Sequence, residues 1–382
     1  MIQFFSRWHI LLVVSTTLFF SYLLVLLMYH SVSEWSVVFS DYETVSSAYP
    51  VSFPAITNLL PAPASSSVLT PLTPPTVLPA TMVFVGDIML ARSVEWWMQE
   101  EGVMYPFTHV PDIIGTSTAV FANFEASIPL RHERTIAYST RFSTDAQYIE
   151  GLHKNGITHV SLANNHTFDF GSSGERNTRS VLEQSGLVPF GHADRLATSS
   201  ITRVQLGSTT VTVLALQTVY GHLNRTELEE LVTQMRATSD LQFVYVHWGT
   251  EYAPSHDTNQ KQLAEYLVSL GVDAIIGHHP HVVEDIQLVA GVPVFYSLGN
   301  FIFDQYFSEA VQQGLTLQLE LGTSTLAFTL LPVTSLGTHA QPRLMVDIER
   351  EQFLSALAKR SDETLQSAIS NGSFSVPHSL QN

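Results

Sequence analysis

Three histidines stand within four positions in the stretch 277–281, Gly-His-His-Pro-His. The apolar run Val272 to Ile276 precedes them and predicts a buried strand. His279 and His281 can direct two ring nitrogens at one centre, because Pro280 stiffens the backbone between them. Neutral imidazole is the commonest protein ligand for a transition metal. The alternative is a histidine-rich surface loop. A metal site is favoured over such a loop if other strands also end in residues that can bind metal.

Several other apolar runs also end in a polar side chain with metal-binding chemistry. We expect six such residues to converge as metal ligands: Asp87, Glu125, Asn165, His247, His279 and His281. This mixed oxygen and nitrogen set suits Mn, Fe or Zn, and it can hold one divalent ion or two about 3.5–4 Å apart. Each residue alone has an ordinary reading as a turn, a surface carboxylate or a core histidine. Their joint occurrence at strand ends favours a metal site.

The elements that must position these residues read as an α/β series interrupted by hairpins. Strands are predicted at 82–85, 119–121, 157–162, 187–190, 241–246, 272–276 and 292–296, with hairpins at 200–207/209–217 and 314–321/326–332. Helices are predicted at 90–101, 145–154, 174–184, 226–236, 258–270 and 351–369, and the last dozen residues are expected to be loose. Thr226 and Glu229 predict a capping box at the start of the fourth helix. The fold class is therefore mixed α/β, in which the hairpins could form a second sheet packed on the first.

Composition excludes several classes of protein. The chain has 382 residues, of which 45% are hydrophobic and only 13% charged, so it can bury a large core. A net charge of −17 argues against nucleic acid as a partner, because phosphate binding requires basic patches. The absence of cysteine excludes disulfides and thiolate metal sites.

An uncharged apolar run spans residues 10–29, which is the length that crosses a bilayer. Arg7 precedes it, and the next Lys or Arg is Arg92, so the positive-inside rule keeps residues 1–9 in the cytoplasm and exports the rest. The alternative, a cleaved signal peptide, normally has a shorter apolar core. We expect a single-pass membrane anchor with the C-terminal domain outside the membrane.

A stretch rich in Ser, Thr and Pro, residues 30–81, reads as an extended spacer rather than a small folded domain, because it shows no periodicity. The main domain is then expected at 82–335, followed by a helical extension and tail at 336–382.

Seven blocks of sequence resemble the signature blocks of the CapA family, the capsule (poly-γ-glutamate) synthesis proteins related to calcineurin-like metallophosphoesterases. They cover residues 82–304 in the family's order, and they are Gly86-Asp87-Ile88-Met89-Leu90-Ala91-Arg92, Asn123-Phe124-Glu125, Leu162-Ala163-Asn164-Asn165-His166, Asp169-Phe170-Gly171, His247-Trp248-Gly249-Thr250-Glu251-Tyr252, His278-His279-Pro280-His281-Val282 and Tyr296-Ser297-Leu298-Gly299-Asn300-Phe301. The resemblance implies a four-layer αββα sandwich, metallophosphoesterase-like, with the site at the strand ends. It also implies a membrane-anchored bacterial protein that faces outward.

The resemblance implies roles for individual residues. Asp87, Glu125, Asn165 and the three later histidines match metal ligands, and His166 matches the acid that protonates a leaving oxygen without binding metal. Classical phosphoesterases have Asp-x-His in the first block, whereas Met89 stands at the position of that histidine here. The missing imidazole leaves a single ion, or a weaker second ion, as the alternative to a full two-metal site.

Two functions follow from these observations. The first is a metal-dependent hydrolase or transferase that acts on phosphoester bonds, or on amide bonds of an anionic cell-surface polymer such as poly-γ-glutamate. Arg92, Glu251 and Asn300 are then expected to contact the substrate, although Arg92 could equally be a surface residue of its helix. The second is a non-catalytic accessory or export subunit that binds the nascent polymer beside other membrane subunits of a synthase. The incomplete first block favours the second function.

Overall fold

The computed structural model describes residues 81–221 and 223–378, all of which belong to one compact unit. The expected anchor at 10–29 and nearly all of the expected spacer lie outside these residues. No helix within the described residues is long and apolar enough to cross a membrane.

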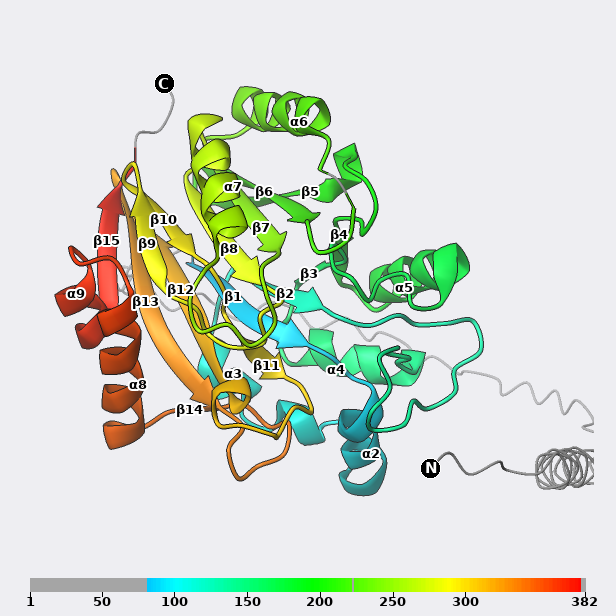
Figure 1. Cartoon of the computed structure of the whole chain (residues 1–382). Coiled ribbons are helices and arrows are strands. Elements are labelled where there is room, and N and C mark those ends of the chain that lie inside the picture. The colour runs from blue at the N-terminus through cyan, green and yellow to red at the C-terminus, as the bar shows by residue number, and fades with distance from the viewer. Residues whose placement is uncertain (1–80, 222, 379–382) are drawn as a thin grey trace, which may run out of the picture. The chain divides into compact units, whose positions relative to one another are not determined.

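Two β-sheets form the centre of this unit (Figure 1). The nine-stranded sheet has the order β14-β13-β12-β1-β2-β3-β4, with β11 paired to β1 and β15 paired to β13. Its strands are β1 (Thr81–Ile88), β2 (Ala119–Phe124), β3 (His159–Ser161), β4 (Val188–Phe190), β11 (Asn300–Ile302), β12 (Gln313–Leu321), β13 (Thr325–Thr334), β14 (Arg343–Leu344) and β15 (Ser373–Pro377). The six-stranded sheet has the order β5-β6-β7-β8-β10-β9, formed by β5 (Ile201–Leu206), β6 (Thr209–Gln217), β7 (Leu241–His247), β8 (Ala274–His278), β9 (Ile286–Val289) and β10 (Val292–Phe295). The expectation of a mixed α/β protein with two sheets is confirmed.

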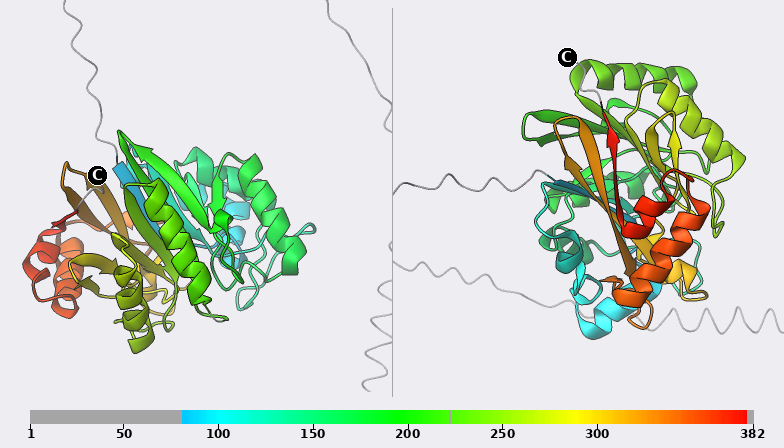
Figure 2. Two further views of the ribbon diagram at one scale, coloured as in Figure 1. Left: turned by 90° about the horizontal axis from the view of Figure 1, so that it is seen from above. Right: turned by 90° about the vertical axis from the view of Figure 1, so that its left-hand side faces the viewer.

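Helices cover the outer face of each sheet (Figure 2). The nine-stranded sheet carries α2 (Arg92–Glu101), α3 (Val110–Ile114), α4 (Ile149–Lys154) and α5 (Gly171–Gln184). The six-stranded sheet carries α6 (Arg225–Thr238) and α7 (Thr258–Ser269). Short 3₁₀ turns lie at Tyr105–Phe107, Ala146–Tyr148, Thr198–Ser200 and Ala310–Gln312.

Apolar side chains of the two sheets meet in a shared core. Phe84 of β1 and Phe121 of β2 pack with Phe243 and Tyr245 of β7, and all four are buried. The hydroxyl of Tyr245 also donates a hydrogen bond to the carbonyl of Val85 at 3.1 Å. These contacts fix one sheet against the other, so the strand ends of both sheets come to the same side.

The C-terminal part differs from the sequence-based expectation. The predicted helix 351–369 is two helices, α8 (Asp347–Arg360) and α9 (Gln366–Asn371), because the chain leaves the helix at Ser361, whose hydroxyl donates to Leu357. The expectation of a loose tail is wrong for Ser373–Pro377, which pairs with β13 along five residues and buries alternate side chains. The segment after residue 335 thus adds helices and a strand to the same core.

Two element boundaries were also predicted wrongly. Strand β1 continues through Asp87 to Ile88, with a register shift between Phe84 and Asp87. The N-cap of α6 is Asn224, whose side chain accepts hydrogen bonds from the N–H groups of Thr226 and Glu227, so no capping box begins at Thr226.

Candidate metal centre

Asp87 lies at the irregular end of β1, fully buried between the two sheets. Its backbone N–H donates to the carbonyl of Gly299 at 3.0 Å. The preceding residue is Gly86, where any side chain would meet that same carbonyl, since an added Cβ would lie 2.0 Å from it. Glycine therefore permits the close approach that directs the Asp87 carboxylate toward the other strand ends.

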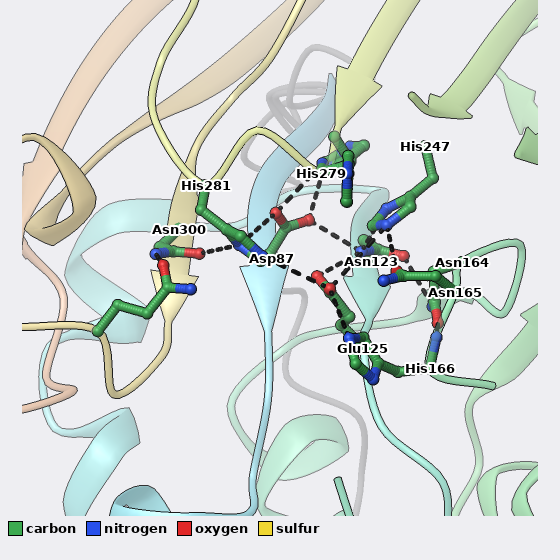
Figure 3. A network of polar contacts seen from close by, with 12 residues as sticks. Asp87, Asn123, Glu125, Asn164, Asn165, His166, His247, His279, His281 and Asn300 are labelled. Carbon is green, nitrogen blue, oxygen red and sulfur yellow. Dashed lines mark hydrogen bonds and ion pairs between the residues drawn. The ribbon is translucent and has the colours of Figure 1, made fainter. Parts of the chain in front are cut away.

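Glu125 follows β2 directly and is fully buried beside Asp87. Its N–H donates to the carbonyl of Ile88 at 2.8 Å, which fixes the residue to the end of β1. The amide of Asn123 joins the two carboxylates, because Nδ2 lies 2.8 Å from Asp87 Oδ1 and 3.4 Å from Glu125 Oε2. Figure 3 shows these side chains pointing toward one another from neighbouring parallel strands.

His247 is the last residue of β7, and its ring lies among the same groups. Its Nδ1 lies 3.3 Å from the amide nitrogen of Asn123, and its Nε2 lies 2.7 Å from Oδ1 of Asn165. Asn165 follows β3, so this contact joins the end of a strand in one sheet to the end of a strand in the other.

His279 and His281 both have backbone angles in the left-handed region, with φ of 98° and 59°. This conformation is uncommon for residues other than glycine, and it occurs often at binding sites that the surrounding fold holds in place. It turns both rings inward on either side of Pro280, and only 4% and 3% of their surfaces are exposed.

Three overlapping groups of acidic and imidazole side chains result from this arrangement. Within each group, the nearest ligand atoms all lie within 4.8 Å of one another. The groups are Glu125, His247 and His279; Asp87, Glu125 and His281; and Glu251, His279 and His281.

Burial and neighbouring charges shift the pKa values of the carboxylates and imidazoles in this cluster. Burial raises the pKa of Glu125 well above its ordinary value. Burial would also raise the pKa of Asp87, but hydrogen bonds and charges from His278 and His281 reverse the effect and lower it. Burial alone would lower the pKa of His281, yet the Glu125 and Asp87 carboxylates raise it to about 9. Burial and the neighbouring imidazoles lower the pKa of His279 to about 4 and that of His247 well below its ordinary value.

Buried polar atoms that lack a hydrogen-bond partner indicate whether these residues could hold a divalent ion. Glu125 Oε1 and His279 Nδ1 are buried and have no hydrogen-bond partner among the described residues. Only histidine nitrogens lie within 4 Å of the carboxylate oxygens of Asp87 and Glu125 as groups that can carry positive charge, among the described residues. A buried carboxylate is costly without a compensating cation. The donor set and the unpartnered atoms therefore fit a divalent ion held by oxygen and nitrogen ligands.

His166 lies at the edge of this cluster. Its Nδ1 lies 2.9 Å from Oδ2 of Asp169, and its Nε2 lies 3.8 Å from Oε1 of Glu125. Its ring stacks on Phe142, with 3.8 Å between the ring centroids. The nitrogen that faces the cluster is thus held close to the ligands, yet His166 belongs to none of the three groups.

The three residues expected at the substrate occupy different positions. The Arg92 guanidinium is ion-paired with Asp304 through Nη2 and donates to the carbonyl of Ser139 at 3.0 Å through Nη1, whereas its buried Nε has no hydrogen-bond partner among the described residues. Glu251 is exposed and lies beside His279 and His281, in one of the three groups of ligand atoms. Asn300 is buried, and its Oδ1 lies 2.9 Å from His281 Nδ1, so it orients that ring.

Sequence reasoning missed four polar residues around the cluster. His278 is fully buried, with Nδ1 3.1 Å from Asp87 Oδ1. Asn123 joins the two carboxylates, and Asn164 in turn donates to Asn123 Oδ1 at 3.0 Å. Asp169 orients His166. All four belong to the sequence blocks quoted above, so the blocks contained the signal, but strand-end position alone did not select them.

Met89 explains how the first block differs from an Asp-x-His block. Its side chain is fully buried in the core beneath the helices of the nine-stranded sheet, and its sulfur accepts the N–H of Ala91 at 3.1 Å. It therefore contributes no ligand. His278 places a different imidazole against Asp87 from the other sheet.

Comparison with known proteins identifies the family. The sequence pattern of the bacterial capsule synthesis protein PGA_cap matches residues 81–305. The PGA biosynthesis protein CapA of Bacillus subtilis is 26% identical over 314 residues, which cover 78% of this chain and 82% of that protein. The capsule biosynthesis protein CapA of Bacillus anthracis is 28% identical over 256 residues, covering 62% of each chain.

Solved structures show weaker similarity. A phosphatase from Mycoplasma pneumoniae matches with a TM-score of 0.41 and 12% identity, over 70% of this chain and 92% of that one. A 5′-nucleotidase from Candida albicans matches with a TM-score of 0.38 and 10% identity, over 64% and 47%. These values carry no functional conclusion. The sequence pattern spans well over half of the chain and includes all three groups of ligand atoms, and the protein therefore belongs to the bacterial capsule synthesis protein family PGA_cap.

Proposed function

We propose that this protein is a metal-dependent hydrolase or transferase that acts on an anionic polymer of the bacterial cell surface. The resemblance to capsule synthesis proteins suggests poly-γ-glutamate as that polymer. One observation supports it most: the fully buried carboxylates of Asp87 and Glu125 both lie within 4 Å of the His281 ring, and Glu125 Oε1 has no hydrogen-bond partner among the described residues.

The residues that would hold the ion are those whose ligand atoms converge: Asp87, Glu125, His247, His279 and His281, with Asn165 and Glu251 at the edge. A bound divalent ion supplies Lewis acidity and lowers the pKa of coordinated water. His166 presents Nε2 to the same space, where it can pass a proton to a leaving atom. Asn123 and Asn300 hold Asp87 and His281 in place through hydrogen bonds.

Charge around the site supports a local contact with the polymer rather than broad electrostatic capture. Arg92 is the one Lys or Arg among the described residues that line its cavity, and Asp304 already neutralises it. Glu251 and Asp169 line the same cavity, and the whole chain carries −17. Like charges repel, so a polyanion would bind at the metal and only weakly elsewhere.

The location of the protein is part of the proposal. Residues 1–9 would remain in the cytoplasm, residues 10–29 would anchor the chain in the membrane, and residues 30–81 would separate the domain from the bilayer. Partners would then be the membrane, the polymer and other membrane subunits of a polymer synthase.

A second candidate is a non-catalytic accessory subunit that binds the nascent polymer. It is favoured by Met89, which is buried in the core and leaves the first block without its imidazole. A Mycobacterium tuberculosis protein named "Probable polyglutamine synthesis accessory protein" is 23% identical over 224 residues, covering 50% of this chain and 59% of that protein. On this account the metal holds the polymer without breaking a bond.

Metal analysis combined with a substrate screen separates these candidates. The purified full-length protein should contain a divalent transition metal and should hydrolyse a phosphoester or a γ-glutamyl amide in the screen. His279→Ala should lose the metal, whereas His256→Ala should keep it, because His256 pairs with Asp285 outside the cluster. Metal without turnover would support the accessory function, and equal metal content in both variants would reject the site.

A further inference from the structure

Two hollows meet at Asn165, at the edge of the metal cluster. Hollow A has a volume of about 660 Å³, and its lining includes Arg92, Tyr138, His166, Glu251, Tyr252 and Phe307. Hollow B has a volume of about 540 Å³, and its lining includes His192, Asp194, Arg195, Gln217, Asn224 and Glu227. Asn165 and Tyr220 line both hollows, so the two are neighbours on either side of these residues.

Hollow B has no role in the metal cluster beyond Asn165. Its volume is nevertheless that of a site for a small organic ligand. A site that recognised only the end of a polymer would need a cavity on one side of the reacting bond. Here space continues past Asn165 and Tyr220 into hollow B, which nothing in the proposed chemistry uses.

Hydrogen bonds hold the walls of hollow B in place. The amide of Gln217 donates to the carbonyls of Ala193 and Tyr220, and its oxygen accepts the N–H of Tyr220 at 3.0 Å. His192 is 6% exposed and lies 2.7 Å from Ser199 Oγ through Nε2. The loop after β4 and the loop after β6 are therefore tied together, and hollow B is formed in advance.

Both hollows reach the surface and carry groups that suit an extended chain. Tyr138 and Phe307 of hollow A are 95% and 66% exposed, and the shared Tyr220 is 67% exposed. In hollow B the ion pair between Arg195 and Asp194 has side chains that are 47% and 53% exposed. An exposed ion pair contributes little to stability, so a carboxylate of a ligand can replace Asp194. The other terminal nitrogen of Arg195 lies 3.9 Å from the buried carboxylate of Glu175, which keeps the guanidinium at this wall.

We propose that the site takes a polymer as an internal segment, with one arm in hollow A, the other in hollow B, and the reacting bond between them beside Asn165 and His166. This inference rests on the proposed function. For poly-γ-glutamate, cleavage adds one water across a γ-amide bond: the hydroxyl joins the carbonyl carbon, and the proton goes to the nitrogen of the departing chain. Two shorter chains result, rather than single residues released from an end.

A binding experiment tests the inference without requiring turnover. The full-length protein in detergent, loaded with Mn²⁺, is titrated against fluorescently end-labelled poly-γ-glutamate, from the dimer to progressively longer chains. Affinity should rise with length until both hollows are spanned. Ala193→Trp, which fills hollow B, and Arg195→Gln, which removes its cation, should flatten this rise and weaken binding of the long chain about tenfold. Arg203→Gln on β5, which lines neither hollow, is the matched control and should retain the rise.

The outcomes separate this inference from the proposed function. The inference is overturned if affinity does not rise with length, or if it rises in the two hollow B variants as steeply as in the wild type. Length-dependent binding that the variants weaken, without cleavage, keeps the inference and rejects the hydrolase. Metal-dependent cleavage that releases only monomers keeps the hydrolase and rejects the inference. Failure of the protein to bind any chain rejects both for this polymer.

Discussion

The Nδ1 atom of His166 lies 2.9 Å from a carboxylate oxygen of Asp169, three residues further along the chain. The same oxygen accepts the N–H of Phe142 at 2.6 Å, so the carboxylate is itself fixed. This contact orients the imidazole so that Nε2 faces Glu125. A ring held in this way, close to the ligands yet outside their groups, has the geometry of a proton donor.

His166→Ala should retain the metal and lose most activity. General acid catalysis typically contributes about 10²–10⁴-fold in rate, so kcat should fall by about that factor. Elemental analysis of the variant should match the wild type, whereas His279→Ala should be depleted of metal. If His166 only stabilises a loop, the variant will melt earlier and keep its kcat, and a folded, metal-loaded, fully active variant removes this residue from the mechanism.

Asp169→Asn should lower kcat by about tenfold while KM and metal content stay near wild type, because the imidazole loses its anionic partner but keeps its place. The double variant with His166→Ala should be no slower than His166→Ala alone, since a positioning residue has no effect once its target is gone. Additive losses in the double variant would show that Asp169 acts through a different group.

Glu125→Gln should change stability in opposite directions with and without metal. Glu125 is fully buried, and burial raises its pKa well above the ordinary value, so the carboxyl itself is costly to the fold. In chelator, the variant should melt at or above the wild-type temperature, with a gain on the order of 1–3 kcal/mol in the free energy of unfolding.

With added Mn²⁺, the order should reverse, because only the wild type gains binding free energy, about 2.7 kcal/mol at a hundred times Kd. Glu265→Gln on the exposed side of α7 is the matched control and should follow the wild type in both conditions. The site would be disproved by a Glu125→Gln variant that metal stabilises as much as the wild type.

The sequence allowed us to predict that the candidate ligands lie at strand ends, because the strands that precede them are parallel. β1, β2 and β3 are parallel neighbours, as are β7 and β8, so the residues that follow them meet at the same edge of each sheet. The sequence does not reveal how one sheet lies against the other. Asn165 and His247 were expected to converge, but the direct contact between their side chains, which joins the two sheets, became visible only in the structure.

Other details escaped prediction because tertiary contacts determine them. β15 reads as a loose tail, since five residues have little local signal, yet its pairing with β13 buries Phe374 and Val376. His278 occupies the last position of β8, where alternation turns it toward the opposite sheet and against Asp87. Glu251 follows no strand directly, so strand-end reasoning did not class it with the ligand atoms.

The orientation of the chain leads to a prediction in whole cells. If residues 10–29 anchor the protein with the domain outside, protease added to intact cells should digest residues 82–382. A known surface protein and a cytoplasmic protein serve as positive and negative controls in the same sample. Survival of the domain while the surface protein is cut would mean that the orientation is wrong.

Glu284 provides a test of pH dependence away from the metal cluster. It is 1% exposed, and its Oε2 accepts a hydrogen bond from Gln260 at 2.7 Å, while Oε1 has no partner among the described residues. Burial raises its pKa to about 8, and the nearby carboxylates of Asp285 and Asp257 act in the same direction. Arg360 and the Gln260 hydrogen bond oppose this shift without cancelling it.

Because the pKa in the folded protein exceeds the ordinary value of 4.5, the folded state binds the extra proton between these two values. Stability from this residue is therefore greatest below pH 4.5 and falls as pH rises through about 8. Glu284→Gln removes the titrating group and keeps an oxygen for Gln260. Its melting temperature should exceed that of the wild type by about 5 °C at pH 9, and this difference should disappear near pH 4.5. Thermal denaturation across this range, with Glu265→Gln as control, measures the difference, and a constant offset at every pH would show that packing, not ionisation, determines the effect.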